Sequence, residues 1–334
     1  MAGSAGAQTR PTSPVLVGYV PAFKGLEATV ARLPRDQYTH VNISFANPDA
    51  SGRFLVGDRL SCMGDGAGGM VTRQALTDAV AAVRAQGSRV LVSVAGGVLP
   101  ACSGDWPALL TPDNRAATIA ELVGLADDFA LDGIDVDIEW ATLDAIDKAG
   151  NFTPFIAELS EALRARGKLL TCATASNPGG MIPDAAIPYF DLVNVMSYDV
   201  IGPSWGQAGA EHSSLATAER DLSVWLNKGV RPERLVLGVP FYGYGFNGFA
   251  PNWAFRDLSR QFGPAAERGD VIGQACAGCR YITFNTPATL ARKADLARSK
   301  AGGIMVWEIS QDTDDHRLVR LLKEHLTPDR AARR

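Results

Sequence analysis

The segment LDGIDVDIEW, residues 131–140, places Asp135, Asp137 and Glu139 at every second position. A period of two is that of a β-strand, so the three acids share one face and the apolar residues between them share the other. The flanking run is too apolar for a solvated edge strand, which is the alternative interpretation. Crowding and partial burial raise the pKa of a carboxyl, as a general acid near neutral pH requires. We therefore predict a buried strand that carries a functional acid.

Seven other short apolar runs have the length and the Val, Ile and Leu content of buried strands. The eight predicted strands are Val15–Val20, His40–Ala46, Arg89–Ala95, Gly133–Ile138, Leu169–Ala175, Leu192–Ser197, Leu235–Phe241 and Gly303–Trp307. Apolar residues at three- and four-residue spacing predict helices at Gln74–Gln86, Asn114–Ala130, Phe152–Arg166, Thr217–Lys228 and Thr286–Lys300.

This alternation predicts a single (β/α)8 TIM barrel over residues 14–327. A doubly wound open sheet is the second choice. That fold would need a glycine-rich phosphate turn after the first strand, and residues 18–21, GYVP, do not form one.

Two predicted connections are long. Asn47–Met70 is rich in glycine. Residues 244–281, between strands seven and eight, form the largest insertion, which we expect to be a loop or small subdomain at the rim of the barrel and not a second domain. The ends of the chain, residues 1–13 and 328–334, are expected to be flexible segments.

Composition excludes some partners. The net charge of −4 gives no general attraction to phosphate, so we expect no nucleic-acid partner. The sequence lacks the ~18 consecutive apolar residues of a membrane span. The N-terminal residues lack the apolar core of a signal peptide, and they start either a secreted chain whose leader was removed or a cytosolic protein. We expect a secreted monomer, extracellular or periplasmic.

The chain has five cysteines. Cys62 and Cys102 fall in two loops that we place on the same face of the barrel, so they can form a disulfide. Cys276 and Cys279 form a CAGC pair, for which a local disulfide or two free thiols is favoured over zinc, because a zinc site would need a second such pair. Cys172 lies in an apolar strand and is expected in the core. No metal site is predicted.

The functional site of such a barrel lies at the carboxyl ends of its strands. Aromatic residues and acids are concentrated at these predicted ends. Aromatic faces around carboxylates suit a sugar, whose C–H groups stack on rings while its hydroxyls reach the acids. The residues at these ends are Tyr19, Phe45, Ser93, Asp137, Glu139, Met196, Tyr198, Asp199, Tyr242 and Trp307.

Four motifs resemble those of the family 18 glycoside hydrolases, the chitinases and endo-β-N-acetylglucosaminidases. DGIDVDIE at 132–139 resembles DGxDxDxE, SVAG at 93–96 resembles SxGG, and MSYD at 196–199 resembles MxYD. Trp307 falls where that family keeps a tryptophan under the bound sugar. The likeness extends over most of the chain. Ala95 departs from the pattern, because the family has glycine there, and this weakens the placement of that turn.

The resemblance implies substrate-assisted retention, an exception to the two-carboxylate scheme. Glu139 would act first as general acid and then as general base. Asp137 would orient the acetamido N–H of the substrate, whose own oxygen attacks the anomeric carbon to give an oxazolinium ion. Asp135 would lie behind Asp137 and share a proton with it. Tyr198 would hydrogen-bond the acetamido oxygen.

The resemblance also implies how the sugar is held. Trp307 would form the floor of the site, while Asp199 would hold a hydroxyl. The walls would be Tyr19, Phe45 and Tyr242. Met196 is counted with these binding residues, although packing is its simpler role. Asp132 is expected to serve structure, by capping the strand or by pairing with Ser93 or a backbone amide. No cofactor is implied.

The substrate expected from the resemblance is chitin or chito-oligosaccharide, with the N-glycan core or peptidoglycan as alternatives. A hypothesis of another class is a chitinase-like lectin. Such proteins typically lose the terminal acid of the signature, and Glu139 argues against it. Trp106, Trp205 and Trp253 could bind further sugars or pack equally well. The four histidines, His40, His212, His316 and His325, receive no catalytic role.

Overall fold

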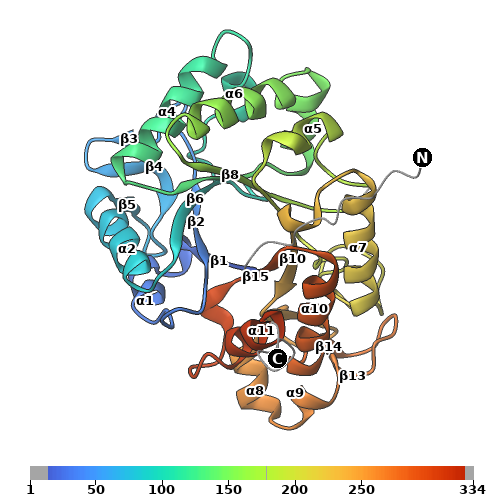
Figure 1. Cartoon of the computed structure of the whole chain (residues 1–334). Helices are drawn as coiled ribbons and strands as arrows, with labels where there is room; N and C mark the ends of the chain where they lie inside the picture. The colour runs from blue at the N-terminus through green and yellow to red at the C-terminus, as the bar shows by residue number, and fades with distance from the viewer. Residues whose placement is uncertain (1–13, 178, 328–334) are drawn as a thin grey trace, which may run out of the picture.

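The computed structural model describes residues 14–177 and 179–327, and the two terminal segments expected to be flexible lie outside this range. Eight parallel strands close into a barrel in the order β1-β15-β10-β9-β8-β7-β6-β2, with helices around the outside (Figure 1). The TIM-barrel prediction is confirmed. The strands are β1 (Val15–Pro21), β2 (His40–Ala46), β6 (Arg89–Ala95), β7 (Gly133–Asp137), β8 (Leu169–Thr174), β9 (Leu192–Val195), β10 (Leu235–Pro240) and β15 (Gly303–Trp307).

The helices bury one apolar face each against the barrel. In α2 this face consists of Leu76, Val80 and Val83. The helix begins after Thr72, whose hydroxyl accepts a hydrogen bond from the Ala75 amide at 3.0 Å. The longer outer helices are α2 (Arg73–Ala85), α4 (Arg115–Asp128), α6 (Phe152–Arg164), α7 (Leu215–Asn227), α10 (Pro287–Lys300) and α11 (Arg317–Leu326), with α1 (Leu26–Val30), α3 (Trp106–Leu109) and α5 (Trp140–Lys148) shorter.

The connection after β2 folds into a small antiparallel sheet. Its strands are β3 (Leu55–Val56), β4 (Arg59–Gly64) and β5 (Met70–Thr72). A disulfide joins Cys62 of β4 to Cys102 in the loop after β6, with the two Cα atoms 5.6 Å apart. The disulfide that the sequence left possible is therefore present, and it ties two loops together at the carboxyl ends of neighbouring barrel strands.

The connection between β10 and α10 forms a subdomain with its own sheet, in the strand order β12-β11-β14-β13. The outer parts of this insertion are orange in Figure 1. Its sheet begins at Tyr242 and ends at Thr283, slightly beyond the expected bounds. Cys276 and Cys279 form a local disulfide within it. Its elements are β11 (Tyr242–Phe246), β12 (Asn252–Ala254), α8 (Phe255–Phe262), α9 (Ala265–Arg268), β13 (Val271–Gly273) and β14 (Tyr281–Thr283).

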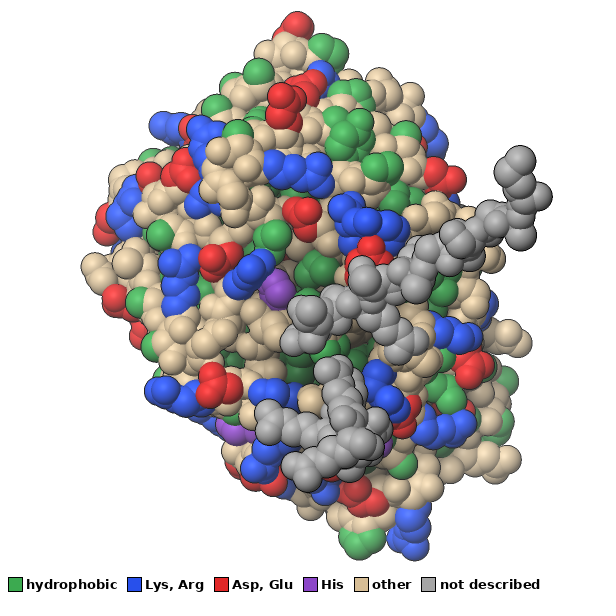
Figure 2. Space-filling model, viewed as in Figure 1, with side chains coloured by type: hydrophobic (Ala, Val, Ile, Leu, Met, Phe, Trp, Pro, Cys, Tyr) green, Lys and Arg blue, Asp and Glu red, His purple; other side chains and the backbone are tan. Residues whose placement is uncertain are grey.

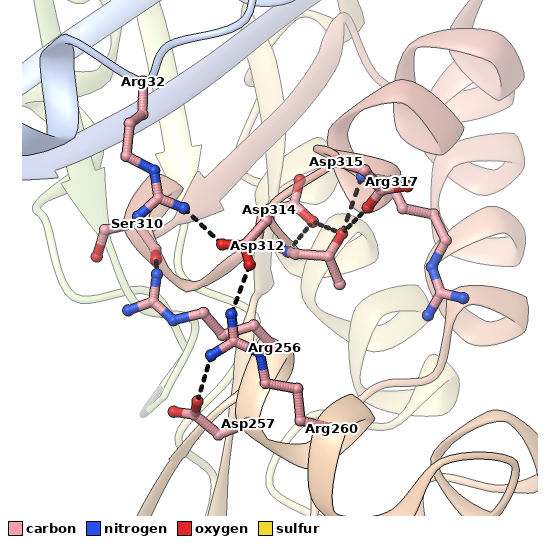
Figure 3. A network of polar contacts seen from close by, with 10 residues as sticks. Arg32, Arg256, Asp257, Arg260, Ser310, Asp312, Asp314, Asp315 and Arg317 are labelled. Carbon is pink, nitrogen blue, oxygen red and sulfur yellow. Dashed lines mark hydrogen bonds and ion pairs between the residues drawn. The ribbon is translucent and has the colours of Figure 1, made fainter.

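A polar network connects α8 of this subdomain to the segment that follows β15 in the chain (Figure 3). Asp314 pairs with Arg32, which follows α1, and with Arg260 of α8. Arg256 of α8 donates to the carbonyl oxygen of Ser310. Exposed ion pairs of this kind each contribute about 0–1 kcal/mol, so the network orients α8 more than it stabilises the fold.

Acidic and basic side chains are interspersed over the face of the described residues shown in Figure 2. This distribution agrees with the small net charge of −4. Among the helices of the described ranges, none has the length and apolar content needed to cross a membrane.

Candidate active site

Asp135 lies inside the barrel, in a layer where Ser93 of β6 and Thr171 of β8 are its register partners. Its carboxylate accepts hydrogen bonds from Thr171 at 2.5 Å, Tyr19 at 2.6 Å and Ser93 at 2.7 Å. Burial raises the pKa of Asp135, and these hydrogen bonds act in the opposite direction. Asn194 of β9 also donates to Asp135, at 3.4 Å, so the acid is fixed by hydroxyls from three other strands and an amide from a fourth.

Tyr19 was predicted to be a wall of the sugar site. The structure instead places it beneath the site, because only 1% of the residue is exposed and its hydroxyl donates to Asp135. Tyr19 thus contacts the acid layer and not the open cleft. Its buried ring also supports Trp307, with the ring centroids 5.5 Å apart.

Asp137, the last residue of β7, is 3% exposed. Burial raises its pKa well above the ordinary value, and the charges of Glu139 and Asp135 raise it further. A hydrogen bond joins Asp137 to Glu139. The expected pairing of Asp137 with Asp135 is not observed, since hydroxyl groups already occupy the oxygens of Asp135. Oδ1 of Asp137 has no hydrogen-bond partner among the described residues.

Glu139 follows β7 directly and precedes α5. Burial, followed by the charge of Asp199, raises its pKa to about 7, while the hydrogen bond from Asp137 lowers it. Because a hydrogen bond joins Glu139 to Asp137, protonation of one acid affects the pKa of the other. Gly97 makes room for this acid, because a Cβ atom at that position would lie 2.6 Å from Oε1 of Glu139.

Glu139 opens into a cavity of about 270 Å³. An adjoining hollow of about 570 Å³ shares much of this lining and extends to Arg220 and Asp221 of α7. The predicted residues Met196, Tyr198 and Asp199 line both hollows. The two hollows together form a cleft at the carboxyl ends of β7, β8 and β9. The full lining of the smaller cavity is Glu139, Trp140, Ala175, Met196, Tyr198, Asp199 and Trp205.

One hydrogen bond holds the carboxylate of Asp199, and a histidine ring packs beside it. The hydroxyl of Tyr242 donates to its Oδ1, and Nδ1 of His212 lies 3.6 Å from the same oxygen. His212 is fully buried, and burial lowers its pKa, so the ring is neutral near pH 7. Tyr244 packs against both rings, with centroids 5.3 Å from His212 and 5.4 Å from Tyr242. Tyr242 therefore supports Asp199 from behind.

His212 and Tyr244 were missed in the sequence analysis. His212 lies in the loop between Asp199 and α7, where no periodic pattern marks it. Its place in the site results from contacts with the insertion. The signal for Tyr244 was its position two residues after Tyr242, on the same face of a strand.

Two aromatic residues form a stacked pair at the ends of β2 and β15. The rings of Phe45 and Trp307 are 5.7 Å apart and inclined by 21°. Gly96 packs under Phe45, because a Cβ atom there would lie 2.8 Å from the ring. Both rings are partly exposed, and they offer the flat apolar surface expected for a sugar floor.

The three tryptophans whose roles the sequence left open, Trp106, Trp205 and Trp253, differ in whether they reach the cleft. Trp205 is 45% exposed on the cavity wall, and its indole N–H donates to the carbonyl oxygen of Asp199 at 2.9 Å. Trp106 is fully buried and donates to Asn47, so it is a packing residue. Trp253 packs against Phe262 within the insertion. Only Trp205 of these three lines the cleft.

Ala95 keeps the turn after β6 in spite of its departure from the family pattern. Its φ of 73° lies in the left-handed region that favours glycine. The turn is held on both sides, since Asn47 donates to the Ala95 carbonyl at 2.9 Å and the Gly96 amide donates to the Asp137 carbonyl at 2.9 Å.

In the described part of the chain, no group of three or more His, Cys, Asp or Glu residues could hold a metal ion.

The model of the glycosyl hydrolases family 18 matches residues 15–312, nearly the whole barrel. The chain belongs to this family. This family 18 chain is 30% identical over 264 residues to Chitinase 63 of Streptomyces plicatus, covering 65% of the chain and 42% of that protein. It is 27% identical over 255 residues to Probable chitinase 10 of Drosophila melanogaster, covering 60% of the chain and 11% of that protein. The chain thus spans less than half the length of either relative.

Solved structures agree with this membership. The family 18 chitinase ChiB from the chitin utilization locus of Flavobacterium johnsoniae superposes with a TM-score of 0.78 at 30% identity, covering 96% of this chain and 95% of that one. A family 18 chitinase of Cycas revoluta, solved in complex with (GlcNAc)3, shares the fold with a TM-score of 0.76 at 21% identity, covering 94% of this chain and 100% of that one. The site described above therefore lies on a family 18 barrel.

Proposed function

We propose that the protein is a retaining glycoside hydrolase that cleaves β-1,4-linked N-acetylglucosamine glycans, chitin or chito-oligosaccharides, by substrate-assisted catalysis. One observation carries the proposal. Glu139 opens into the cleft with a pKa of about 7, and the buried Asp137 is hydrogen-bonded to it from behind. This arrangement supplies a proton donor near neutral pH together with a carboxyl that can steer an amide.

In the first step, Glu139 protonates the glycosidic oxygen and the bond from that oxygen to the anomeric carbon breaks. The acetamido oxygen of the substrate attacks the same carbon from the opposite face, which gives an oxazolinium ion. Asp137 turns towards the acetamido N–H and accepts its hydrogen bond. Tyr198 donates to the acetamido oxygen. Holding the internal nucleophile in place removes several kcal/mol of entropic cost.

In the second step, the Glu139 carboxylate takes a proton from a water molecule, whose oxygen attacks the anomeric carbon and opens the ring of the ion. Two inversions give net retention of the anomer. Asp199, held by the hydroxyl of Tyr242, binds a sugar hydroxyl, and Trp307 with Phe45 stacks on the sugar face.

The comparisons support this substrate class. The curated relatives quoted above carry chitinase names, and the Cycas revoluta protein was solved with an N-acetylglucosamine trimer. The pair of acids, Asp137 and Glu139, also argues against a lectin without activity, because sugar binding alone does not require a proton donor of raised pKa.

The test is a product analysis on chitin oligomers, high-mannose glycopeptide and peptidoglycan in parallel, with the anomer of the first product followed by proton NMR. We expect cleavage of the chitin oligomers with a β-anomer product. Inversion would contradict the mechanism. Preferred cleavage of glycopeptide or peptidoglycan would keep the mechanism and replace the substrate, and binding without cleavage would indicate a lectin.

A thiazoline analogue of an N-acetylglucosamine oligomer gives an independent test of the internal nucleophile, because it resembles the oxazolinium ion. We expect competitive inhibition with an affinity well above that of the matching substrate, as transition-state and intermediate analogues show. An enzyme that hydrolyses chitin oligomers and is indifferent to the thiazoline does not use the acetamido group.

We also propose that the protein works outside the cytosol. The support is the pair of disulfides, Cys62–Cys102 and Cys276–Cys279, since disulfides persist mainly in oxidising compartments. Thiol titration of the purified, unfolded protein should find one free thiol, that of Cys172. Five titratable thiols in protein isolated from its native source would contradict this proposal.

A further inference from the structure

Lys293 of α10 is the only lysine in the described part of the chain that is fully buried. A buried ammonium group is rare unless its donors are all used. Here Nζ donates to the carbonyl oxygen of Ser213 at 2.8 Å, to the hydroxyl of Ser213 at 2.7 Å and to Oδ1 of Asn285 at 2.7 Å. An ammonium group has three N–H donors, and each of them has an acceptor.

All three contacts involve Ser213, either directly or through Asn285. Ser213 receives two of them directly, and Asn285 donates its amide back to the Ser213 carbonyl at 2.7 Å. Lys293 and Asn285 thus enclose the backbone of Ser213 from the side of α10. Because α10 packs against the barrel wall, this fixes a loop residue to a rigid element.

His212 and Ser213 hold the backbone on either side of two site residues, Tyr198 and Asp199. The Ser213 hydroxyl donates to the carbonyl oxygen of Ser197 at 2.6 Å, and the amide of Val200 donates to the carbonyl oxygen of His212 at 3.1 Å. Tyr198 and Asp199 are the two residues between these contacts. Asp199 has a φ of 60°, in the left-handed region that Asp adopts more readily than most L-residues.

We propose that Lys293 is a positioning residue for the reaction, which acts through Ser213 to fix the backbone of Tyr198 and Asp199 in the cleft. This proposal rests on the proposed function, since it assigns Lys293 to the sugar-binding side of that site. The lysine does not touch the substrate. It determines where the Tyr198 hydroxyl and the Asp199 carboxylate lie relative to Glu139.

The surrounding charges favour a protonated amine. Burial lowers the pKa of Lys293 to about 7, and the nearby acids Asp270, Asp221 and Glu211 oppose this change. A neutral amine would have only two N–H donors for three acceptors, so the observed contacts fit the ammonium form.

The experiment compares Lys293→Met, which keeps the length of the side chain and removes the donors, with the wild-type enzyme on a chitin oligomer. We expect kcat to fall roughly 10- to 100-fold with a much smaller change in KM, since a displaced catalytic group impairs the transition state most. The fraction of folded protein is measured by circular dichroism at the assay temperature. Unchanged kcat in folded Lys293→Met would overturn the proposal.

Lys168→Met is the matched control. Nζ of Lys168 donates to the carbonyl oxygens of Ala126 and Leu131 at 3.0 and 2.8 Å, before the start of β8 and at the opposite end of the barrel from the cleft. The Lys168→Met change should lower the melting temperature and leave kcat unchanged. An equal loss of kcat in both variants at equal loss of stability would show that Lys293 is merely structural.

Ser213→Ala is the second variant and removes a single oxygen, so it keeps the test open if Lys293→Met does not fold. We expect a fall in kcat in Ser213→Ala, and in the double variant a loss smaller than the product of the two single losses, because both changes break one chain of contacts. Full activity of Ser213→Ala, or independent effects, would refute the link. If the wild-type enzyme cleaves no N-acetylglucosamine glycan, the proposed function fails first; if it cleaves them and the variants are normal, only the role of Lys293 fails.

Discussion

The two ends of β7 use the same residue type for opposite purposes. At the amino end, Asp132 accepts hydrogen bonds from the Val90 amide at 2.8 Å and from Arg84 at 3.0 Å. At the carboxyl end, Asp137 and Glu139 have no Lys or Arg ion-pair partner within the described ranges, and crowding and burial raise both pKa values. These acids at the bottom of the barrel have donors that compensate their charge, and the two acids at the top lack such partners, as the proposed reaction requires.

The same contrast extends around the barrel. At the bottom, Asp191 repeats the arrangement of Asp132, since it accepts from the Leu170 amide at 2.9 Å and pairs with Arg164 at 3.5 Å. At the top, Ala95, Trp140 and Asp199 adopt positive φ values of 73°, 45° and 60°. Left-handed backbone also occurs at the bottom, at Asp36 with a φ of 57° and at Ala130 with a φ of 51°, so it does not distinguish the two ends. Charge compensation, and not backbone geometry, therefore marks the stabilising end of this barrel.

Glu139→Gln gives the largest expected difference between the two ends. The amide keeps the shape of the side chain but has no acidic proton to transfer, so kcat should fall ~10²- to 10⁴-fold. Binding of a chitin oligomer, measured by calorimetry, should change little. Loss of binding together with activity would mean that the acid at the top is structural, as the acids at the bottom are.

The pH dependence should follow the reactive end. Glu139 must be protonated to act as the acid, so kcat/KM should fall about tenfold per pH unit above its pKa of about 7. The carboxyl is also a stability group. Its folded pKa is raised from 4.5, so the folded state holds the proton more tightly and the stabilisation, complete below pH 4.5, is lost as pH rises through about 7.

Melting curves of the wild type and Glu139→Gln from pH 4 to pH 8 test the second statement. Glutamine does not titrate, so the stability of Glu139→Gln relative to that of the wild type should increase with pH. A difference in melting temperature that is independent of pH would show that Glu139 has an ordinary pKa, and the contrast between the two ends of β7 would lose its electrostatic basis.

Gly97→Ala should impair the reactive end without unfolding the protein. The new methyl group would lie 2.6 Å from Oε1 of Glu139, so the acid has to move. We expect kcat/KM to fall roughly 10- to 100-fold, as for other small displacements of a catalytic group. Gly124→Ala in α4, where nothing lies within 4 Å of the added atom, is the control and should be fully active and slightly more stable. Equal activity of both variants would contradict the role of Gly97.

Asp132→Ala tests the stabilising end. The change leaves the Val90 amide without its acceptor and removes the Arg84 pair, so the free energy of unfolding should fall by ~1–3 kcal/mol in urea titrations. The kcat of the folded variant should equal that of the wild type. A marked loss of kcat would show that the two ends of β7 are coupled.

Ala95→Gly has the smallest expected effect. A left-handed φ costs an L-residue roughly 1–2 kcal/mol, and the greater freedom of glycine in the unfolded chain offsets part of the gain, so the variant should be more stable by up to about 1 kcal/mol. Ala81→Gly, at an exposed position in α2, should instead be less stable by about 1 kcal/mol. Destabilisation of equal size in both would show that Ala95 is not strained.

The barrel could be predicted because its strands are buried on both faces, so each is a short continuous apolar run that stands out in the sequence. Four strand ends were placed too late. β8 ends at Thr174 and not at Ala175, and β10 ends at Pro240 and not at Phe241. β7 ends at Asp137 and not at Ile138, and β9 ends at Val195 and not at Ser197, since the chain leaves the sheet there to line the cleft. The sheet of the insertion was not predicted, because β12, β13 and β14 are too short to show a period.

The order of acids on β7 and the residues at the strand ends were fixed by the sequence, because alternation along a strand is a local property of the backbone. The choice of partner for each acid was decided only by the tertiary structure. Asp137 pairs with Glu139, and not with Asp135, because hydroxyls from three other strands reach Asp135 once the barrel closes. Likewise His212 and Lys293 join the site through contacts between segments far apart in the chain, and no local pattern records such contacts.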